Sequence, residues 1–282
     1  MTTRPVSSIA EVAEAVVGIL RQRPSALLSD FDGTLSPVAP TPDLAEAAPG
    51  VAETLAGLAP KLALTAIVTG RGIADVANRV EAPGLVYVGN HGLEWLAGGS
   101  HHVHPAGQEA QKVLPEALRD IEQRLTAHVS LDGVIFEDKV YSASIHYRLA
   151  PDPVAVRAVL EPAMHEVAEE YGFWVSDGKM VFELRPGASI NKGTATRHLL
   201  AEYGIRGAVF LGDDVTDADA FRVLTQMRND EDISTLSVGV LTLDTAPVVI
   251  ESADYLLDGV DDVVSMLLQV NELLDASPGE AQ

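Results

Sequence analysis

Apolar runs and helical stretches alternate over the first part of the chain. The segments 26–31, 62–70 and 84–90 are apolar enough to form buried strands. The segments between them, 42–60 and 72–80, carry the Ala, Leu and charged residues typical of helices, and a proline interrupts the first of these. Strands that alternate with helices predict right-handed crossover units and a parallel sheet covered on both faces.

A different rhythm follows. Residues 96–107 are rich in Gly, His and Pro, which predicts a loop or linker. The pattern then predicts a helix, two strands, a helix and two strands, at 108–128, 133–139, 141–149, 152–172 and 173–186. Within the last segment, Asp177 and Gly178 are typical of a hairpin turn. We therefore expect a self-contained α+β domain at this place in the chain.

The alternating pattern resumes after this insert. It predicts helices at 191–204, 216–227 and 260–274, with strands at 208–214 and 236–241. The expected fold class is α/β, a Rossmann-like parallel-sheet core that carries an inserted α+β domain. The predicted boundaries are a first core part at 1–107 with a leading helix within 1–24, the insert at 108–186, a second core part at 187–275 and a disordered tail at 276–282.

Composition narrows the classes of function. The net charge of −22 makes binding to nucleic acid or to an anionic membrane surface unexpected. No apolar run approaches the roughly 20 residues that span a bilayer, and residues 1–24 lack the continuous apolar core of a signal peptide. The absence of cysteine excludes disulfides, thiolate metal sites and cysteine nucleophiles, and it suits the reducing cytoplasm in which we expect the protein.

Polar side chains follow several of the predicted core strands at the point where each strand ends. In an open parallel sheet, ligands bind beyond these carboxyl ends. Any one of these residues could instead be an ordinary turn or helix-cap residue. The set comprises Asp30 and Asp32, then Thr69, Gly70 and Arg71, then Asn90 and His91, then Asp213, Asp214 and Asp217, with Lys192 at the start of a helix.

This set of residue types suits phosphoryl transfer. Carboxylates that meet in one place repel each other unless a cation holds them. Because the candidates are hard oxygen donors, with no cysteine and no evident histidine pair, they favour Mg²⁺ over zinc. A lysine and a hydroxyl can complete the electrostatic surroundings of a transferring phosphoryl group. An aspartate near the metal can then act as a covalent nucleophile.

The strings DFDGTLSP, VTGR and LGDDVTDADAF, together with the helix that begins at Lys192, resemble the motifs of the haloacid dehalogenase superfamily. The resemblance implies that Asp30 is the nucleophile and Asp32 the general acid and base. It implies that Thr69 binds the phosphoryl oxygens and that Lys192 neutralises charge. Mg²⁺ would be held by the carboxylate of Asp30, the main-chain carbonyl of Asp32 and Asp213, with support from Asp214 and with Asp217 as a further candidate.

Further strings, including GNHGLEW, SASIHYR and GKMVFELRP, resemble the trehalose-6-phosphate phosphatase family over most of residues 26–260. In this resemblance the insert is a cap domain that selects the substrate. It implies that Gly70, Arg71, Asn90 and His91 of the core bind substrate, and that the cap adds Glu137, His146, Arg148, Lys179 and Glu183.

Each of these assignments has a structural alternative. Positions 179, 181 and 183 share one face of a predicted strand, where Lys179 and Glu183 could form a surface ion pair instead of contacting a sugar. His146 could lie on the surface, His91 could be a hydrogen-bonded structural residue, and Arg71 could cap a helix. His101, His102 and His104 read as part of a solvated linker because they lack metal-ligand spacing.

The sequence therefore predicts a Mg²⁺-dependent phosphatase that hydrolyses trehalose 6-phosphate to trehalose and phosphate through an aspartyl phosphate. The alternatives are a phosphatase for another phosphorylated sugar, such as sucrose phosphate or a glycosyl-phosphoglycerate, a phosphosugar mutase, and a non-catalytic module that binds a sugar phosphate. We expect a small-molecule sugar-phosphate ligand, no nucleic-acid or membrane partner, and a monomer or weak homo-oligomer.

Overall fold

The chain folds into two compact units in a computed structural model that describes residues 5–187, 189–243 and 245–276. The core unit runs up to His101 and resumes at Asn191, and the inserted unit spans His102–Ile190. The predicted disordered tail at 276–282 lies outside the described residues, except for Ala276.

A mostly parallel sheet forms the centre of the core unit. Its strand order is β12-β11-β10-β1-β2-β3-β4-β5, in which β12 to β3 are parallel and β4 runs antiparallel to β3. This arrangement confirms the predicted α/β class. The strands are β1 (Ser25–Ser29), β2 (Leu64–Val68), β3 (Val86–Gly89), β4 (Glu94–Ala97), β5 (Ser100–Val103), β10 (Gly207–Gly212), β11 (Ser234–Val240) and β12 (Tyr255–Leu257).

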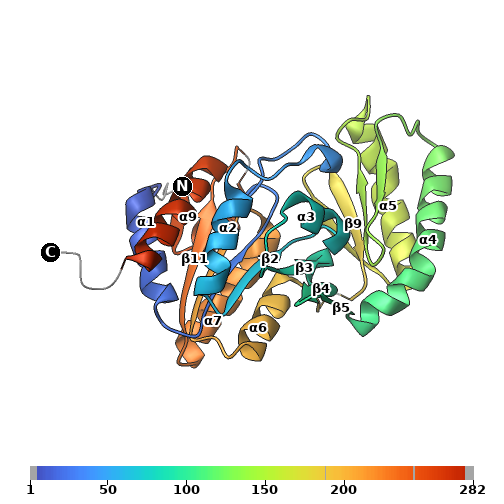
Figure 1. The fold of residues 1–282 in the computed structure, drawn as a ribbon. Coiled ribbons are helices and arrows are strands. Elements are labelled where there is room, and N and C mark those ends of the chain that lie inside the picture. The colour runs from blue at the N-terminus through green and yellow to red at the C-terminus, as the bar shows by residue number, and fades with distance from the viewer. Residues whose placement is uncertain (1–4, 188, 244, 277–282) are drawn as a thin grey trace. The chain divides into compact units, whose positions relative to one another are not determined.

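Helices cover both faces of this sheet, which explains why the central strands are apolar without alternation (Figure 1). Leu27 of β1 packs into the cluster on one face, and its neighbour Leu28 packs into the cluster on the other. The first face carries α1 (Ile9–Leu20), α2 (Val51–Leu58), α3 (Ile73–Arg79) and α9 (Gly259–Asp275). The second carries α6 (Lys192–Glu202), α7 (Val215–Asp230) and α8 (Pro247–Ser252).

The inserted unit has two layers. Its antiparallel sheet has the order β6-β7-β9-β8, and two long helices pack on one face of it around Ile145 and Phe182. Because side chains alternate along a strand, Ser144 and Glu183 lie on the opposite, polar face. The elements are α4 (Pro105–Thr126), β6 (Ile135–Asp138), β7 (Ala143–His146), α5 (Pro153–Tyr171), β8 (Trp174–Gly178) and β9 (Val181–Arg185).

The expected loop at 96–107 is wrong in its first half, because β4 and β5 form a hairpin there. Gly98 and Gly99 make its turn with φ values of 56° and 80°, which glycine adopts without strain. His101 in β5 reaches Glu94 in β4, with 2.8 Å between Nε2 and Oε2. His104 accepts a hydrogen bond from the backbone N–H of Ala106 and thereby caps α4.

The predicted hairpin turn at Asp177 and Gly178 is also wrong. Both residues belong to β8, where Asp177 pairs with Phe182, and the turn falls at Lys179 and Met180. Pairing with β9 holds both residues in the strand, and Asp177 also accepts hydrogen bonds from Arg157 of α5. Lys179 is therefore a turn residue and does not share a strand face with Glu183.

Three short 3-10 helices connect elements of the core unit at Pro42–Leu44, Ala59–Lys61 and Asn90–Gly92. The sequence did not predict α8 or β12, which are both short; β12 is the edge strand of the sheet. In the part of the chain that the structure describes, no helix combines the length and the apolar character needed to cross a membrane.

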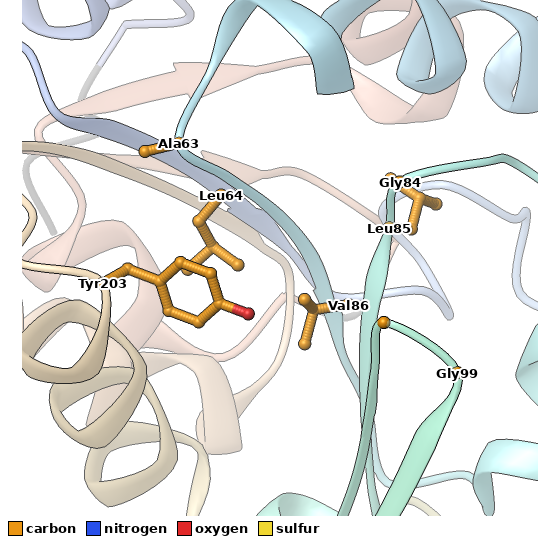
Figure 2. A pocket seen from close by; sticks show the side chains of 8 residues that line it. Ala63, Leu64, Gly84, Leu85, Val86, Gly99 and Tyr203 are labelled. Atoms are coloured by element: carbon orange, nitrogen blue, oxygen red, sulfur yellow. The ribbon is translucent and has the colours of Figure 1, made fainter.

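A cavity of about 410 Å³ opens at the amino ends of β2 and β3 (Figure 2). Leu64 and Val86 begin these strands, and Tyr203 extends toward them from the end of α6. Gly98 and Gly99 of the β4–β5 hairpin complete the lining. The predicted polar residues follow the carboxyl ends of the strands. The cavity lies at the opposite edge of the sheet.

Phe210 provides a test of this packing. Its side chain is fully buried in β10 and meets the ring of Phe221 edge to face, with 6.0 Å between the centroids. We expect Phe210→Ala to lower the free energy of unfolding by about 3–5 kcal/mol, measured by urea denaturation, because the site cannot collapse around the lost ring. The control Leu268→Ala alters an exposed side chain of α9 and should cost far less. Equal losses would contradict the assigned core.

Candidate active site

The predicted polar residues of the core unit lie at one edge of its sheet. Asp30 follows β1, Thr69 follows β2, Asn90 follows β3 and Asp213 follows β10, and all four are buried. These strands are parallel neighbours, so their carboxyl ends meet at the same edge. The backbone N–H of Asp30 donates to the carbonyl of Leu211 at 2.9 Å, which extends the β1–β10 ladder into the site.

Lys192 lies at the centre of this edge. Its ammonium Nζ contacts Oδ1 of Asp30 at 2.8 Å and Oδ1 of Asp217 at 2.7 Å. Lys192 is the first residue of α6, and only 2% of its side chain is exposed. A cation at a helix N-terminus is unfavourable with the helix dipole, and a buried charge loses its hydration. The two carboxylates offset both costs, so all three residues depend on one another.

The pKa values in this cluster are shifted strongly. Burial raises the pKa of Asp30 well above its usual value, and repulsion from Asp217 adds to the rise, whereas Lys192 opposes it. Burial also raises the pKa of Asp217, again against the effect of Lys192. Burial lowers the pKa of Lys192, but attraction to Asp217 and Asp30 outweighs this and raises it, which keeps the side chain an ammonium. A further cation in the site would favour ionised Asp30.

Asp213 approaches the turn that follows Asp30 very closely. The hydroxyl of Thr34 donates to its Oδ1 at 3.3 Å. Gly33 has a φ of 77°, and a Cβ at this position would lie 2.2 Å from Oδ2 of Asp213. Glycine is therefore required at position 33 both for its backbone conformation and for the space that Asp213 occupies.

Asp217 is tied to the backbone as well as to Lys192. Its Oδ2 accepts hydrogen bonds from the N–H groups of Asp213 and Asp214, at 3.1 and 3.0 Å. The resemblance gave Asp217 only as a candidate to support a metal site. Among the described residues, however, Asp30, Asp213 and Asp217 are the acidic groups whose oxygens lie within 4.8 Å of one another. Asp214 is instead the N-cap residue of α7.

These three carboxylates fit a hard divalent cation by the chemistry of their donors. They are buried, they supply oxygen only, and Lys192 compensates part of their charge. Both oxygens of Asp217 accept hydrogen bonds, Oδ1 from Lys192 and Oδ2 from the backbone N–H groups of Asp213 and Asp214.

Asp32 lies in different surroundings from Asp30, although the two are separated by one residue. Its side chain is 41% exposed and forms a bidentate ion pair with the guanidinium of Arg71. The distances are 2.7 Å from Nε to Oδ2 and 2.7 Å from Nη2 to Oδ1. The turn through Gly33 and Thr34 thus presents one buried and one accessible carboxylate.

The residues that follow β2 and β3 lie at the same edge of the sheet as these acids; they are Thr69, Gly70, Asn90 and His91. The Oγ1 of Thr69 accepts a hydrogen bond from the N–H of Arg71 at 3.2 Å. Asn90 and His91 take the uncommon φ values of 51° and 57°, and the ring of His91 lies so close to Gly70 that a Cβ there would be 2.6 Å from Nε2. The sequence therefore correctly grouped these residues at one edge of the sheet.

Sequence reasoning missed Glu94, which holds the side chain of Asn90 and the start of α3. The carboxylate is buried, and its Oε1 accepts hydrogen bonds from the side chain of Asn90 at 2.7 Å and from the N–H of Ile73 at 3.0 Å. Its Oε2 meets His101. A signal was present, because Glu94 follows Asn90 at a spacing of four within the string GNHGLEW.

The inserted unit holds a second group of polar side chains on the face of its sheet opposite to α4 and α5. Lys139 contacts Glu183 at 3.0 Å and Glu137 at 3.9 Å. His146 meets Glu137 at 3.0 Å, and Ser144 donates to Glu183 at 3.1 Å. Lys139 was missed, although it stands two residues after Glu137 and so shares its strand parity.

Two predicted sugar-binding residues lie apart from this group in the hydrogen-bond pattern. Arg148 donates from Nη2 to the main-chain carbonyl of Lys179 at 3.0 Å. The anticipated alternative of an ion pair between Lys179 and Glu183 is not what the structure shows, because Glu183 pairs with Lys139. Arg148 and the Lys179 turn therefore support each other at the end of the β8–β9 hairpin.

The close approach at Gly33 can be tested by stability. We expect Gly33→Ala to lower the urea midpoint of unfolding much more than Gly50→Ala. Both positions have positive φ, at 77° and 86°, so both variants carry the backbone strain of a non-glycine residue. Only at Gly33 does the added Cβ meet Asp213, whereas Gly50 has nothing within 4 Å. Equal midpoints for the two variants would contradict the described contact.

Comparison with known proteins identifies the family of this chain. A family model described as trehalose-phosphatase matches residues 28–247. A trehalose-phosphate phosphatase of Mycobacterium tuberculosis is 34% identical over 252 residues, which cover 85% of this chain but only 62% of that relative.

Two solved structures share the fold. The C-terminal domain of Candida albicans trehalose-6-phosphate phosphatase superposes with a TM-score of 0.75 at 24% identity, covering 93% of this chain and 97% of that one. A haloacid dehalogenase-like hydrolase from Bacteroides thetaiotaomicron gives 0.60 at 17% identity, covering 87% and 99%. With the extent of the family match, these likenesses show that the chain belongs to the trehalose-phosphatase family and has the haloacid dehalogenase-like fold.

Proposed function

We propose that the protein is a Mg²⁺-dependent phosphatase that hydrolyses trehalose 6-phosphate to trehalose and inorganic phosphate through an aspartyl phosphate on Asp30. The observation that carries this proposal is the buried carboxylate of Asp30, held by Lys192 at 2.8 Å beside Asp213 and Asp217. Membership of the trehalose-phosphatase family supports the choice of substrate. The chain spans only about three fifths of the length of the curated relatives, so the activity is proposed for this chain on its own residues.

We assign Asp30, Asp213 and the main-chain carbonyl of Asp32 as the groups that would hold Mg²⁺. When bound, the ion supplies positive charge that stabilises the phosphoryl oxygens and the ionised form of the nucleophile. The remaining residues act around it. Asp217 holds Lys192 and the backbone at Asp213 in place, and the Lys192 ammonium opposes the negative charge shared by the nucleophile and the phosphoryl group.

The reaction has two half-reactions. In the first, a carboxylate oxygen of Asp30 attacks phosphorus while the bond from phosphorus to the sugar oxygen breaks, and Asp32 donates a proton to that oxygen. In the second, Asp32 takes a proton from water, the resulting hydroxide attacks phosphorus, and the bond to Asp30 breaks to release phosphate. The hydroxyl of Thr69 binds a phosphoryl oxygen throughout.

The contrast between the two aspartates supports these roles. Asp30 is buried among charges, which suits a nucleophile that must be held in one orientation. Asp32 is far more exposed, which suits a group that exchanges protons with the leaving sugar and with water. The turn at Gly33 and Thr34 keeps both at the same edge of the sheet.

The polar face of the inserted unit supports a sugar-binding role for that unit. A disaccharide presents many hydroxyl groups, each of which both donates and accepts hydrogen bonds. Lys139 and His146 can donate and Glu137 and Glu183 can accept, and cross-strand contacts fix these side chains relative to one another. We propose that this face, together with Arg148 and Lys179, contacts the sugar.

A panel of sugar phosphates tests the proposal directly. With Mg²⁺, we expect release of phosphate from trehalose 6-phosphate to exceed release from sucrose 6-phosphate and glucose 6-phosphate, and we expect chelation of the metal to abolish it. Asp30→Asn should lower kcat by more than about 1,000-fold, because an amide cannot serve as the nucleophile. Asp230→Asn, at an exposed carboxylate that ends α7, is the control and should behave as wild type.

Three outcomes would contradict the proposal. Equal rates on all sugar phosphates would contradict the assigned substrate. Activity of Asp30→Asn near the wild-type level would contradict the nucleophile. No release of phosphate from any ester would favour a binding module without catalysis.

The sugar contacts can be separated from the phosphate contacts. We expect Lys139→Met to raise KM for trehalose 6-phosphate about 10-fold, the cost of one hydrogen bond to a charged group, and to change KM for p-nitrophenyl phosphate by less than about two-fold. Lys112→Met removes an exposed lysine from α4 of the same unit and serves as the control. Equal increases in KM on both esters would show that Lys139 is not a sugar contact.

A further inference from the structure

Arg71 links the accessible carboxylate of Asp32 to Asp75 and to the carbonyl of Pro42 in the core unit. It follows Gly70 directly after β2, and only 7% of its side chain is exposed. Two of its nitrogens, Nε and Nη2, donate to the two oxygens of Asp32, each at 2.7 Å. This parallel arrangement fixes the plane and the direction of a carboxylate, which one hydrogen bond would leave to rotate.

The rest of the guanidinium is engaged on its other side. Nη1 donates to Oδ2 of Asp75 at 2.6 Å and to the carbonyl of Pro42 at 2.9 Å. The group also lies over the ring of Phe31, with 5.5 Å from Cζ to the centroid. A guanidinium has five N–H donors, and four of those in Arg71 have acceptors within the core unit. Little donor capacity is left for a phosphate.

A second arginine, Arg79, contacts the same aspartate. Arg79, the last residue of α3, contacts Oδ1 of Asp75 with Nη2 at 2.7 Å and with Nε at 2.8 Å. It also donates to the carbonyl of Ala45. Asp75 thus lies between the two arginines, and Arg71 is held by Asp75 of α3 and by the carbonyl of Pro42.

We propose that Arg71 is a positioning residue that orients the carboxylate of Asp32 for proton transfer and does not itself bind the phosphate. The proposal rests on the proposed function, in which Asp32 is the general acid and base. It replaces the expectation that Arg71 contacts the substrate. The physical reason is that a 41% exposed side chain samples several rotamers unless it is held, and proton transfer requires one geometry.

Arg71→Gln tests the role by separating kcat from KM on trehalose 6-phosphate, with Arg79→Gln as the matched control. Like Arg71, Arg79 pairs with Asp75 and donates to a carbonyl of the loop at 42–45, but its hydrogen bonds and ion pairs do not include Asp32. For Arg71→Gln we expect kcat to fall about 100-fold, the scale of a misplaced catalytic group, while KM and the inhibition constant of inorganic phosphate stay within about two-fold of wild type. Arg79→Gln should retain kcat within about three-fold, because Arg71 still reaches Asp32.

A double-mutant cycle tests whether Arg71 acts through Asp32. In the Asp32→Asn background, adding Arg71→Gln should change the residual rate on p-nitrophenyl phosphate by less than about two-fold, because the group that Arg71 orients is already disabled. Arg71→Lys keeps the charge without the paired donors, so its kcat should fall between those of wild type and Arg71→Gln. This variant also carries the test if Arg71→Gln fails to fold.

The opposing results are distinct. An inhibition constant for phosphate that rises about 10-fold with kcat unchanged would assign Arg71 to phosphate binding. Equal losses in Arg71→Gln and Arg79→Gln, or a full further loss in the Asp32→Asn background, would overturn the positioning role while the proposed function stands. A wild-type chain that hydrolyses no phosphate ester would contradict the proposed function and the positioning role together.

Discussion

The buried contact of Lys192 with Asp30 and Asp217 is the interaction on which the site depends. Breaking a buried ion pair by removing one partner costs about 3–5 kcal/mol, because the other charge is left without compensation. Here one ammonium serves two carboxylates, and Asp217 in turn holds the backbone at Asp213. The carboxyl ends of β1 and β10 are therefore held together by side chains as well as by the sheet.

This arrangement gives two neighbouring aspartates opposite properties. Asp30 is buried among charges, whereas Asp32 is accessible and pairs with Arg71. The partners differ: Asp30 contacts Lys192 of α6, whereas Asp32 contacts Arg71, which follows β2. A nucleophile and a proton-transfer group can thus be encoded one residue apart and still occupy different electrostatic surroundings.

Much of this was predictable from sequence, because it follows from local patterns. The alternation of apolar strands and helices predicted the α/β class, and strand-end residues such as Asp30 and Thr69 were correctly expected at one edge. What could not be predicted depends on contacts between distant residues. Asp217 lies beside Lys192 only after α6 and α7 have packed, and the pairing of Lys139 with Glu183 requires the register of β7 with β9. The turn at Lys179 was misplaced because cross-strand pairing overrode the Asp-Gly signal.

Transfer of the phosphoryl group to Asp30 can be tested by trapping the aspartyl phosphate. Acid quenching during turnover of trehalose 6-phosphate, followed by borohydride reduction, converts a phosphorylated aspartate into homoserine, which peptide mass spectrometry locates. We expect homoserine at position 30, in a fraction of the chains that depends on substrate. Homoserine at Asp32 or Asp213 instead, or turnover that leaves all three aspartates unmodified, would contradict it.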